Sequence, residues 1–157
     1  MVSEWDGPGA GDAPPPASNL PADLDGIVGF HLRLAHGAVY RHFTETFAAL
    51  NLTQKQVSVL WLVAAEPGLA QTALSARLQM DRATVMAIVN RLQDRGFVVR
   101  GKSAVDGRKQ TLHLTPAGQA ALAEARTAIG AHEDWLKARF TRAEVRKLIE
   151  LLARIHG

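Results

Sequence analysis

Two short helical patterns separated by a two-residue turn, followed at once by two β-strand patterns, constrain this chain more than any other feature. Apolar residues at helical spacing predict helices over 71–78 and 82–95, with Gln79-Met80 as the turn between them. Asp81 is placed to cap the second helix, and Gly96 is placed to end it. Two helices joined by so short a turn form a helix-turn-helix.

The segment after Gly96 indicates a β-hairpin. FVVR at 97–100 and QTLHLT at 110–115 contain β-branched and alternating residues, and Asp106-Gly107 lies in the loop between them. Further helices are expected on both sides of this block, at 22–50, 53–65, 116–139 and 141–157. This order predicts a mainly α fold with a small sheet (α+β): a winged helix-turn-helix flanked by N- and C-terminal helices.

The basic side chains are concentrated in the same block. The 157-residue chain has a net charge of only +3. Residues 70–116, however, carry three acidic side chains against eight basic ones: Arg77, Arg82, Arg91, Arg95, Arg100, Lys102, Arg108 and Lys109. A local basic surface of this kind favours a polyanionic partner.

Other parts of the composition narrow the class of protein. Residues 1–21 contain five of the seven prolines, which predicts a disordered tail. The absence of cysteine excludes disulfides, thiolate metal sites and thiol-based redox sensing, and it suits a reducing cytoplasm. No stretch is long and apolar enough for a membrane span, and no secretory signal is expected. We therefore expect a cytoplasmic protein with no membrane association.

The predicted helix at 82–95 has two contrasting faces. One face is apolar and must be buried; it carries Val85, Ile88, Val89 and Leu92. The opposite face presents Arg82, Ala83, Met86, Ala87 and Asn90. Such a face suits the major groove of DNA, where Arg pairs with guanine, Asn pairs with adenine, and methyl or thioether groups contact thymine methyls. Thr84 is expected to hold a phosphate through its hydroxyl and the local N–H groups.

The hairpin loop adds a second predicted DNA contact. An Arg at the tip of a hairpin beside a recognition helix reaches the minor groove, where the negative potential is enhanced. We expect Asp106 to hold the Arg108 guanidinium in a charge-assisted bidentate pair, and Lys109 to attract phosphates. The sequence thus predicts a double-stranded DNA partner, contacted by Arg82, Ala83, Thr84, Met86, Asn90, Asp106, Arg108 and Lys109.

Three segments resemble the MarR (multiple antibiotic resistance regulator) family of winged helix-turn-helix transcription regulators. They are LTQKQVSVLWLV (52–63), LSARLQMDRATVMAIVNRLQDRGFVVR (74–100) and DGRKQTLHLTPAG (106–118). The last segment carries the family's Asp-x-Arg pattern before a strand that ends in Leu-Thr-x-x-Gly. One departure is Ala70, which stands where relatives often have Ser or Thr to begin a helix.

The resemblance implies an assembly as well as a fold. It implies a homodimeric repressor on a palindromic operator, with half-sites roughly one helical turn of DNA apart. On this interpretation residues 51–116 form the DNA-binding domain, while 22–50 and 117–157 form the helical dimerisation region.

The resemblance also implies a small-molecule effector that alters DNA affinity. Arg33, His36 and Tyr40 share one face of the first helix, and Trp61 in the next helix could pack nearby. A guanidinium would pair with the carboxylate of a small aromatic acid, and the rings would form apolar walls. Two alternatives stay open: these residues serve only in an interface or the core, or the effector is a larger aryl-CoA thioester.

Enzyme motifs are not found in the sequence. It has no nucleophile elbow and no phosphate-binding glycine loop, and Leu136 stands where a zinc-binding motif starting at His132 needs its second histidine. We therefore expect no enzymatic activity, no metal and no cofactor. The alternative function is a helical protein-interaction module that uses the basic hairpin for an acidic partner, and a preference for one DNA sequence over another would distinguish the two.

Overall fold

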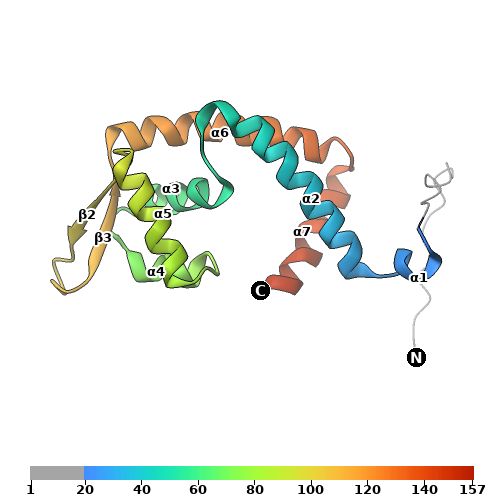
Figure 1. Ribbon diagram of the computed structural model, residues 1–157, viewed down its shortest axis with the longest axis horizontal. Coiled ribbons are helices and arrows are strands. Elements are labelled where there is room, and N and C mark those ends of the chain that lie inside the picture. The colour runs from blue at the N-terminus through green and yellow to red at the C-terminus, as the bar shows by residue number, and fades with distance from the viewer. Residues whose placement is uncertain (1–19) are drawn as a thin grey trace. The chain divides into compact units, whose positions relative to one another are not determined.

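The computed structural model describes residues 20–157 in two units, one ending at Ala38 and the other spanning Val39–Gly157 (Figure 1). Nearly all of the predicted tail at 1–21 lies outside the described residues. The first elements are α1 (Ala22–Asp25), α2 (Val28–Phe47) and the 3-10 turn η1 (Ala48–Leu50). The elements that follow are α3 (Gln54–Ala65), β1 (Leu69–Ala70), α4 (Gln71–Arg77), α5 (Arg82–Asp94), β2 (Val98–Lys102), β3 (Gln110–Leu114), α6 (Pro116–Lys137) and α7 (Arg142–His156).

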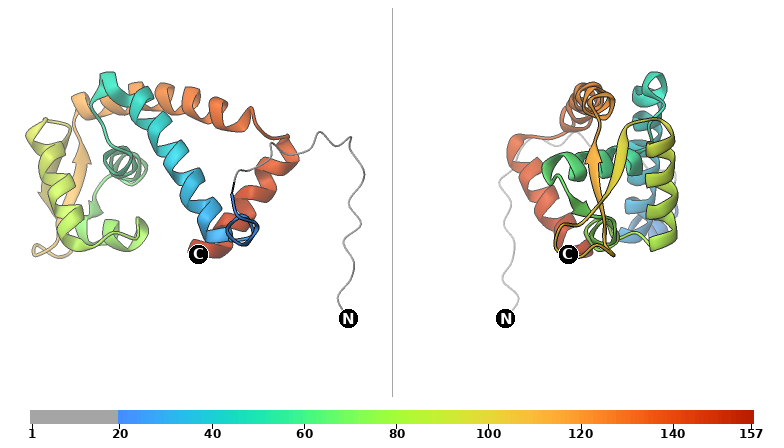
Figure 2. Two further views of the ribbon diagram at one scale, coloured as in Figure 1. Left: turned by 45° about the vertical axis from the view of Figure 1, so that its right-hand side comes forward. Right: turned by 90° about the vertical axis from the view of Figure 1, so that its left-hand side faces the viewer.

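The second unit contains the predicted winged helix, and the predicted fold class is confirmed. Its strands form one antiparallel sheet in the order β1-β3-β2, with Val98 opposite Leu114 and Lys102 opposite Gln110. The β2–β3 hairpin lies beside α5, as both panels of Figure 2 show. Strand β1 was not predicted, because two residues are too few to show an alternating pattern.

Local capping explains where several helices begin. Thr53 and Thr141 each form the predicted capping box, and Thr115 caps α6 with Pro116 at its first position. The predicted single helix at 22–50 is instead divided into α1, α2 and η1. The first break falls at Gly26, a residue that costs roughly 1 kcal/mol in a helix interior.

The core of the second unit joins the winged helix to the long helix that follows it. The largest fully buried side chains come from α2, α3, α4, α5, β2 and β3, and they include Phe47, Leu60, Leu74, Leu92 and Leu112. Leu122 and Ala125 add α6 to the same apolar cluster. In contrast, α7 has no buried residue, although its apolar side chains recur at helical spacing. Within residues 20–157, no helix combines the length and apolar character needed to cross a bilayer.

Gly118 has a packing role at the base of the hairpin. A Cβ built at this position would lie 2.0 Å from the carbonyl oxygen of Phe97. The same carbonyl accepts a hydrogen bond from the Thr115 N–H at 3.1 Å. The first turn of α6 therefore packs directly on the backbone between α5 and β2, and only glycine allows this approach.

We expect Gly118→Ala to lower the free energy of unfolding by roughly 1–3 kcal/mol, because the backbone on both sides of the contact must shift. Gly130→Ala is the matched control in the same helix, since a Cβ there meets nothing within 4 Å. That variant should gain up to about 1 kcal/mol from helix propensity. Thermal unfolding followed by circular dichroism measures both effects, and equal changes in the two variants would contradict the packing role.

Two imidazoles join α2 to α6 inside the second unit. The Nδ1 atoms of His42 and His132 lie 2.7 Å apart in a hydrogen bond, and the His42 ring stacks on Trp135 at 3.9 Å between centroids. His132 is only 5% exposed. Burial lowers the pKa of His132, and the nearby His42 lowers it further, while Glu133 acts in the opposite direction. A neutral His132 is therefore part of the folded packing.

The lowered pKa of His132 makes folding stability depend on pH. The unfolded chain, where a histidine titrates near 6.5, binds more protons than the folded chain just below that pH. The contribution of neutral His132 to the folding stability is fully present above about pH 6.5, and it is lost as the pH falls through the folded-state pKa. We expect the Tm of the wild type to drop more than that of His132→Gln between about pH 7.5 and about pH 5.5. Parallel pH profiles for the two proteins would show that His132 does not carry this dependence.

Candidate nucleic-acid interface

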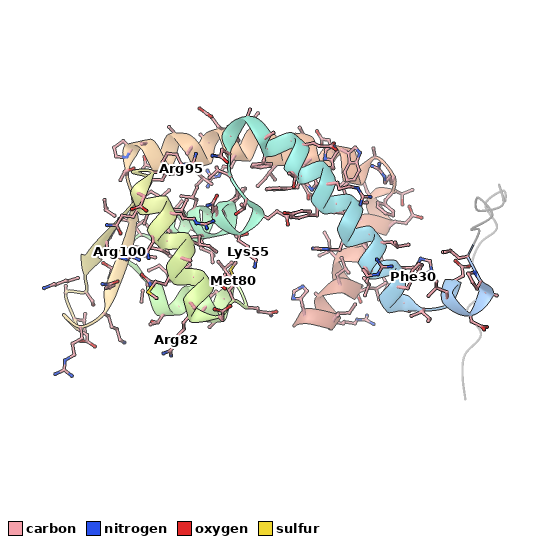
Figure 3. The ribbon with its side chains drawn as sticks, viewed as in Figure 1. Phe30, Lys55, Met80, Arg82, Arg95 and Arg100 are labelled. Atoms are coloured by element: carbon pink, nitrogen blue, oxygen red, sulfur yellow. The ribbon has the colours of Figure 1, made fainter. Side chains whose placement is uncertain are left out.

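Helix α5 presents the two faces that its sequence predicts. Val85, Val89 and Leu92 are almost completely buried, whereas Arg82, Ala83, Ala87 and Asn90 are exposed and Met86 keeps 51% of its surface. Figure 3 shows Arg82 at the start of α5 with its side chain pointing away from the helix. The outer face therefore combines one cation, one amide and small or thioether groups, with no carboxylate among them.

The start of α5 differs from the expectation for Thr84. Its backbone N–H donates to Asp81 Oδ1 at 2.8 Å, and its hydroxyl donates to Asp81 Oδ2 at 2.6 Å. The hydroxyl bond, followed by the backbone bond, holds the pKa of Asp81 below its usual value. The backbone bond is the helix cap that the sequence predicts, whereas the hydroxyl that the sequence assigned to a phosphate donates to the capping carboxylate. Thr84 fixes the start of the helix.

A groove between α4 and α5 extends this face. Its volume is about 450 Å³. Its lining adds polar residues of α4 to the α5 face: Gln71, Thr72, Ser75, Arg82, Ala83, Val85 and Met86. Sequence reasoning missed the α4 residues, although Gln71, Thr72 and Ser75 recur on one polar side of the predicted helix.

The hairpin loop is shaped by Asp106, but differently from the prediction. Asp106 Oδ1 accepts a hydrogen bond from the backbone N–H of Arg108 at 3.1 Å, and the Asp106 carbonyl accepts one from the N–H of Lys109 at 2.9 Å. The ion pairs within residues 20–157 do not include one between Asp106 and the Arg108 guanidinium. A short carboxylate reaches the backbone two residues ahead with little strain. Asp106 therefore sets the turn and leaves the guanidinium exposed.

Apart from Arg100, the basic residues of the block fall into two groups. Arg77 pairs with Glu66, and Arg95 donates to the carbonyls of Leu50 and Asn51. In the described part of the chain, five other side chains make no intramolecular hydrogen bond or ion pair: Arg82, Arg91, Lys102, Arg108 and Lys109. The second group supplies positive charge that the protein itself does not neutralise.

Arg100 connects the hairpin to both helices of the helix-turn-helix, a role that sequence reasoning missed. Its Nε donates to Gln71 Oε1 at 3.1 Å, and its Nη2 donates to Asn90 Oδ1 at 2.7 Å. A third bond runs from Nη1 to Gln93 Oε1. Figure 3 shows Arg100 on β2, next to α5. The partners are as far as 29 residues apart in the sequence, so no local pattern reveals the cluster.

The predicted effector residues lie in different surroundings. In the first unit, the Arg33 guanidinium lies 5.2 Å from the centre of the Phe30 ring, and His36 is on the same helix. In the second unit, Tyr40 is 53% exposed and lines a cavity of about 180 Å³ near η1. Trp61 is 39% exposed and lies under the guanidinium of Arg126, at 4.8 Å.

A different cavity, which the sequence did not indicate, lies among α2, α3 and α6 of the second unit. Its volume is about 380 Å³. The walls are largely apolar, with polar groups at several points: Val39, Phe43, Gln54, Val57, Ser58, Ile129, His132, Glu133 and Leu136. Its size falls in the range of about 300–1,000 Å³ typical of small-molecule sites. Three separate helices contribute to it, so only the tertiary structure brings these residues together.

Comparisons with known proteins agree with this fold. The model of the MarR family matches residues 50–109. The putative transcriptional regulatory protein for the hcr operon of Thauera aromatica is 36% identical over 134 residues, which is 85% of this chain and 81% of that protein.

Two solved structures of transcriptional repressors named CouR are similar over nearly the whole chain. One, bound to a 23-mer DNA duplex, has a TM-score of 0.84 and 34% identity, and covers 89% of this chain and 100% of its own. Another, bound to p-coumaroyl-CoA, has a TM-score of 0.79 and 33% identity, with 88% and 98% covered. The chain belongs to the MarR family of transcriptional regulators.

Proposed function

We propose that this protein is a homodimeric repressor that binds a palindromic operator and releases it when a small aromatic carboxylate, or the CoA thioester of one, binds. The observation that carries the proposal is the combination of the exposed α5 face with unpaired cations on the adjacent hairpin. The similar repressor bound to a DNA duplex supports it. An operator-binding protein works beside the chromosome, so the proposal includes a cytoplasmic location.

The proposed DNA contacts divide into three kinds. Arg82 and Asn90 read base edges in the major groove, where Ala83 and Met86 contact apolar groups. Arg108 enters the adjacent minor groove from the hairpin, and Lys109 contacts phosphates. Asp106 and Thr84 act on these contacts indirectly, through the hairpin turn and the start of α5.

The proposed dimer interface uses residues 22–50 and 117–157, which leaves 51–116 for DNA. Its support is exposed apolar surface in each unit. On α7 the exposed apolar side chains are Leu148, Ile149, Leu151, Leu152 and Ile155, and in the first unit they are Ile27, Val28, Leu32 and Leu34. Apolar surface of this extent is typical of an interface, and a second copy would present the same two-fold related surface.

The proposed effector is an aromatic acid or an aryl-CoA thioester, and two regions are candidates for it. The repressor solved with p-coumaroyl-CoA supports the thioester. The cavity among α2, α3 and α6 has apolar walls that suit an aromatic ring. The sequence predicts a second region for the effector, where polar side chains would bind the polar end of the ligand. These side chains are Arg33, His36, Tyr40 and Trp61.

We expect Arg108→Ala to weaken operator binding by roughly 1–3 kcal/mol, the value of one well-made DNA contact. Asp106→Ala should weaken it too, although it removes a negative charge, because the turn that presents Arg108 loses its acceptor. Asp106→Asn is the matched variant, since its amide oxygen still accepts the Arg108 N–H, and it should bind at least as tightly as the wild type. Fluorescence anisotropy with labelled operator measures all three. Tighter binding by Asp106→Ala would show that its charge matters more than the turn.

The whole proposal is tested with DNA from beside the protein's own gene, compared with random DNA of equal length. We expect selective binding that salt weakens, and release by one member of a panel of aromatic acids and their CoA thioesters. Equal binding to both DNAs would contradict the repressor and favour the alternative, a helical interaction module with an acidic protein partner.

Variants locate the effector within the same assay. Ser58→Leu narrows the cavity among α2, α3 and α6, and it should prevent release while leaving operator binding intact. Thr44→Leu alters the smaller cavity beside Tyr40 and so tests the other candidate region, and unchanged release in this variant would exclude that cavity. Arg33→Ala and His36→Ala test the residues predicted from the sequence, and unchanged release in both would remove them from the effector site.

A further inference from the structure

Arg100 and its three amide partners Gln71, Asn90 and Gln93 form the Arg100 cluster. The guanidinium determines which atoms of these amides face outward. A guanidinium has only donors, and the oxygen is the only acceptor of an amide. Each amide must therefore turn its oxygen toward Arg100, which assigns the orientation of Asn90, Gln71 and Gln93 from chemistry alone. Since the donor is charged, each bond is stronger than one between neutral groups.

This orientation changes what Asn90 offers to DNA. An unrestrained Asn can pair with adenine by accepting from N6 and donating to N7. In this structure Oδ1 of Asn90 already accepts from Arg100 at 2.7 Å. A second donor approaching that oxygen, such as the adenine N6 amino group, would also meet the positive charge beside it. The NH₂ group of Asn90 keeps its donors for an acceptor.

We propose that Arg100 is a positioning residue for specificity: by holding the Asn90 oxygen, it makes Asn90 select guanine rather than adenine in the operator. Guanine presents two acceptors, N7 and O6, on its major-groove edge, and both are attracted by the Asn90 NH₂ group and by the nearby guanidinium. This proposal rests on the proposed DNA-binding function, and it replaces the pairing with adenine that the sequence suggested.

The cluster is not needed to form the hairpin. Strand β2 is already paired with β3 at five positions, from Val98–Leu114 to Lys102–Gln110, and Val98 is fully buried. The Arg100 side chain is only half-buried and points its donors at the two helices. A change confined to its end group should therefore leave the sheet in place, and the single nitrogen of a lysine cannot hold amides on two helices as the three guanidinium nitrogens do.

The test compares base preferences at every operator position for the wild type, Arg100→Lys and Asn90→Ala, using a randomised operator library. Arg91→Lys is the matched control, because it makes the same chemical change next to Asn90 at a side chain without an intramolecular partner. We expect the wild type to prefer guanine at the position where Asn90→Ala loses preference. At that position Arg100→Lys should lower the guanine-to-adenine ratio by at least about fivefold. Arg91→Lys should keep the ratio unchanged.

Two results would overturn the inference while the repressor function stands: a wild-type preference for adenine at the Asn90 position, or an unchanged ratio in Arg100→Lys. If the wild type showed no base preference at any operator position, the proposed function would be overturned, and the inference with it. If Arg100→Lys does not fold, Arg100→Gln takes its place in the library assay. The free wild-type protein offers a second measurement: the side-chain NH₂ signals of Asn90, Gln71 and Gln93 in ¹⁵N NMR spectra should shift in the Arg100 variant but not in Arg91→Lys.

Discussion

The burial of one face of α5 is the constraint on which the rest of the second unit depends. Val85, Val89 and Leu92 must leave water, and the surfaces that receive them belong to α3, α4 and the sheet. The opposite face of α5, with Arg82, Ala83, Met86 and Asn90, is left exposed. The hairpin follows directly from the end of α5, and Arg100 of β2 donates to Asn90, so the hairpin lies beside the exposed face. The position of the candidate DNA-binding surface is thus a consequence of core packing.

Some basic side chains of residues 70–116 are bound within the protein, and others have no intramolecular partner. Arg95 and Arg77 are held by carbonyl and carboxylate oxygens of the protein, and Arg100 is held by three amides. The cations at the start of α5 and on the hairpin have no such partners within the described residues. Because a protein gains little by leaving charges unpaired and close together, these positions indicate a polyanion as the missing partner. Net charge alone hides this division, since +3 is a small value for a chain of this length.

The hydrogen bonds that surround the candidate contacts mostly orient other groups. Asp81 orders the first turn of α5, Asp106 orders the hairpin turn, and Arg100 orients the amides. None of the three needs to touch a base to affect recognition. Pre-organised side chains and backbone lose less conformational freedom on binding, which is why a binding surface of this kind depends on residues beside it.

Much of the fold could be predicted from the sequence, because helix periods, caps and the hairpin signal depend on residues a few positions apart. The capping boxes at Thr53 and Thr141, the buried face of α5 and the exposed face with Arg82 and Asn90 follow from such local patterns. The sequence by itself thus determined the order of the elements, the winged-helix class and the family. Only the tertiary structure decided how the polar groups are used. Thr84 binds its cap, Asp106 binds backbone, and Arg100 binds amides on two helices up to 29 residues away. The physical reason is that a hydrogen bond or a cavity wall is chosen among all groups that folding brings within reach, and for His42 and His132 that choice spans 90 residues.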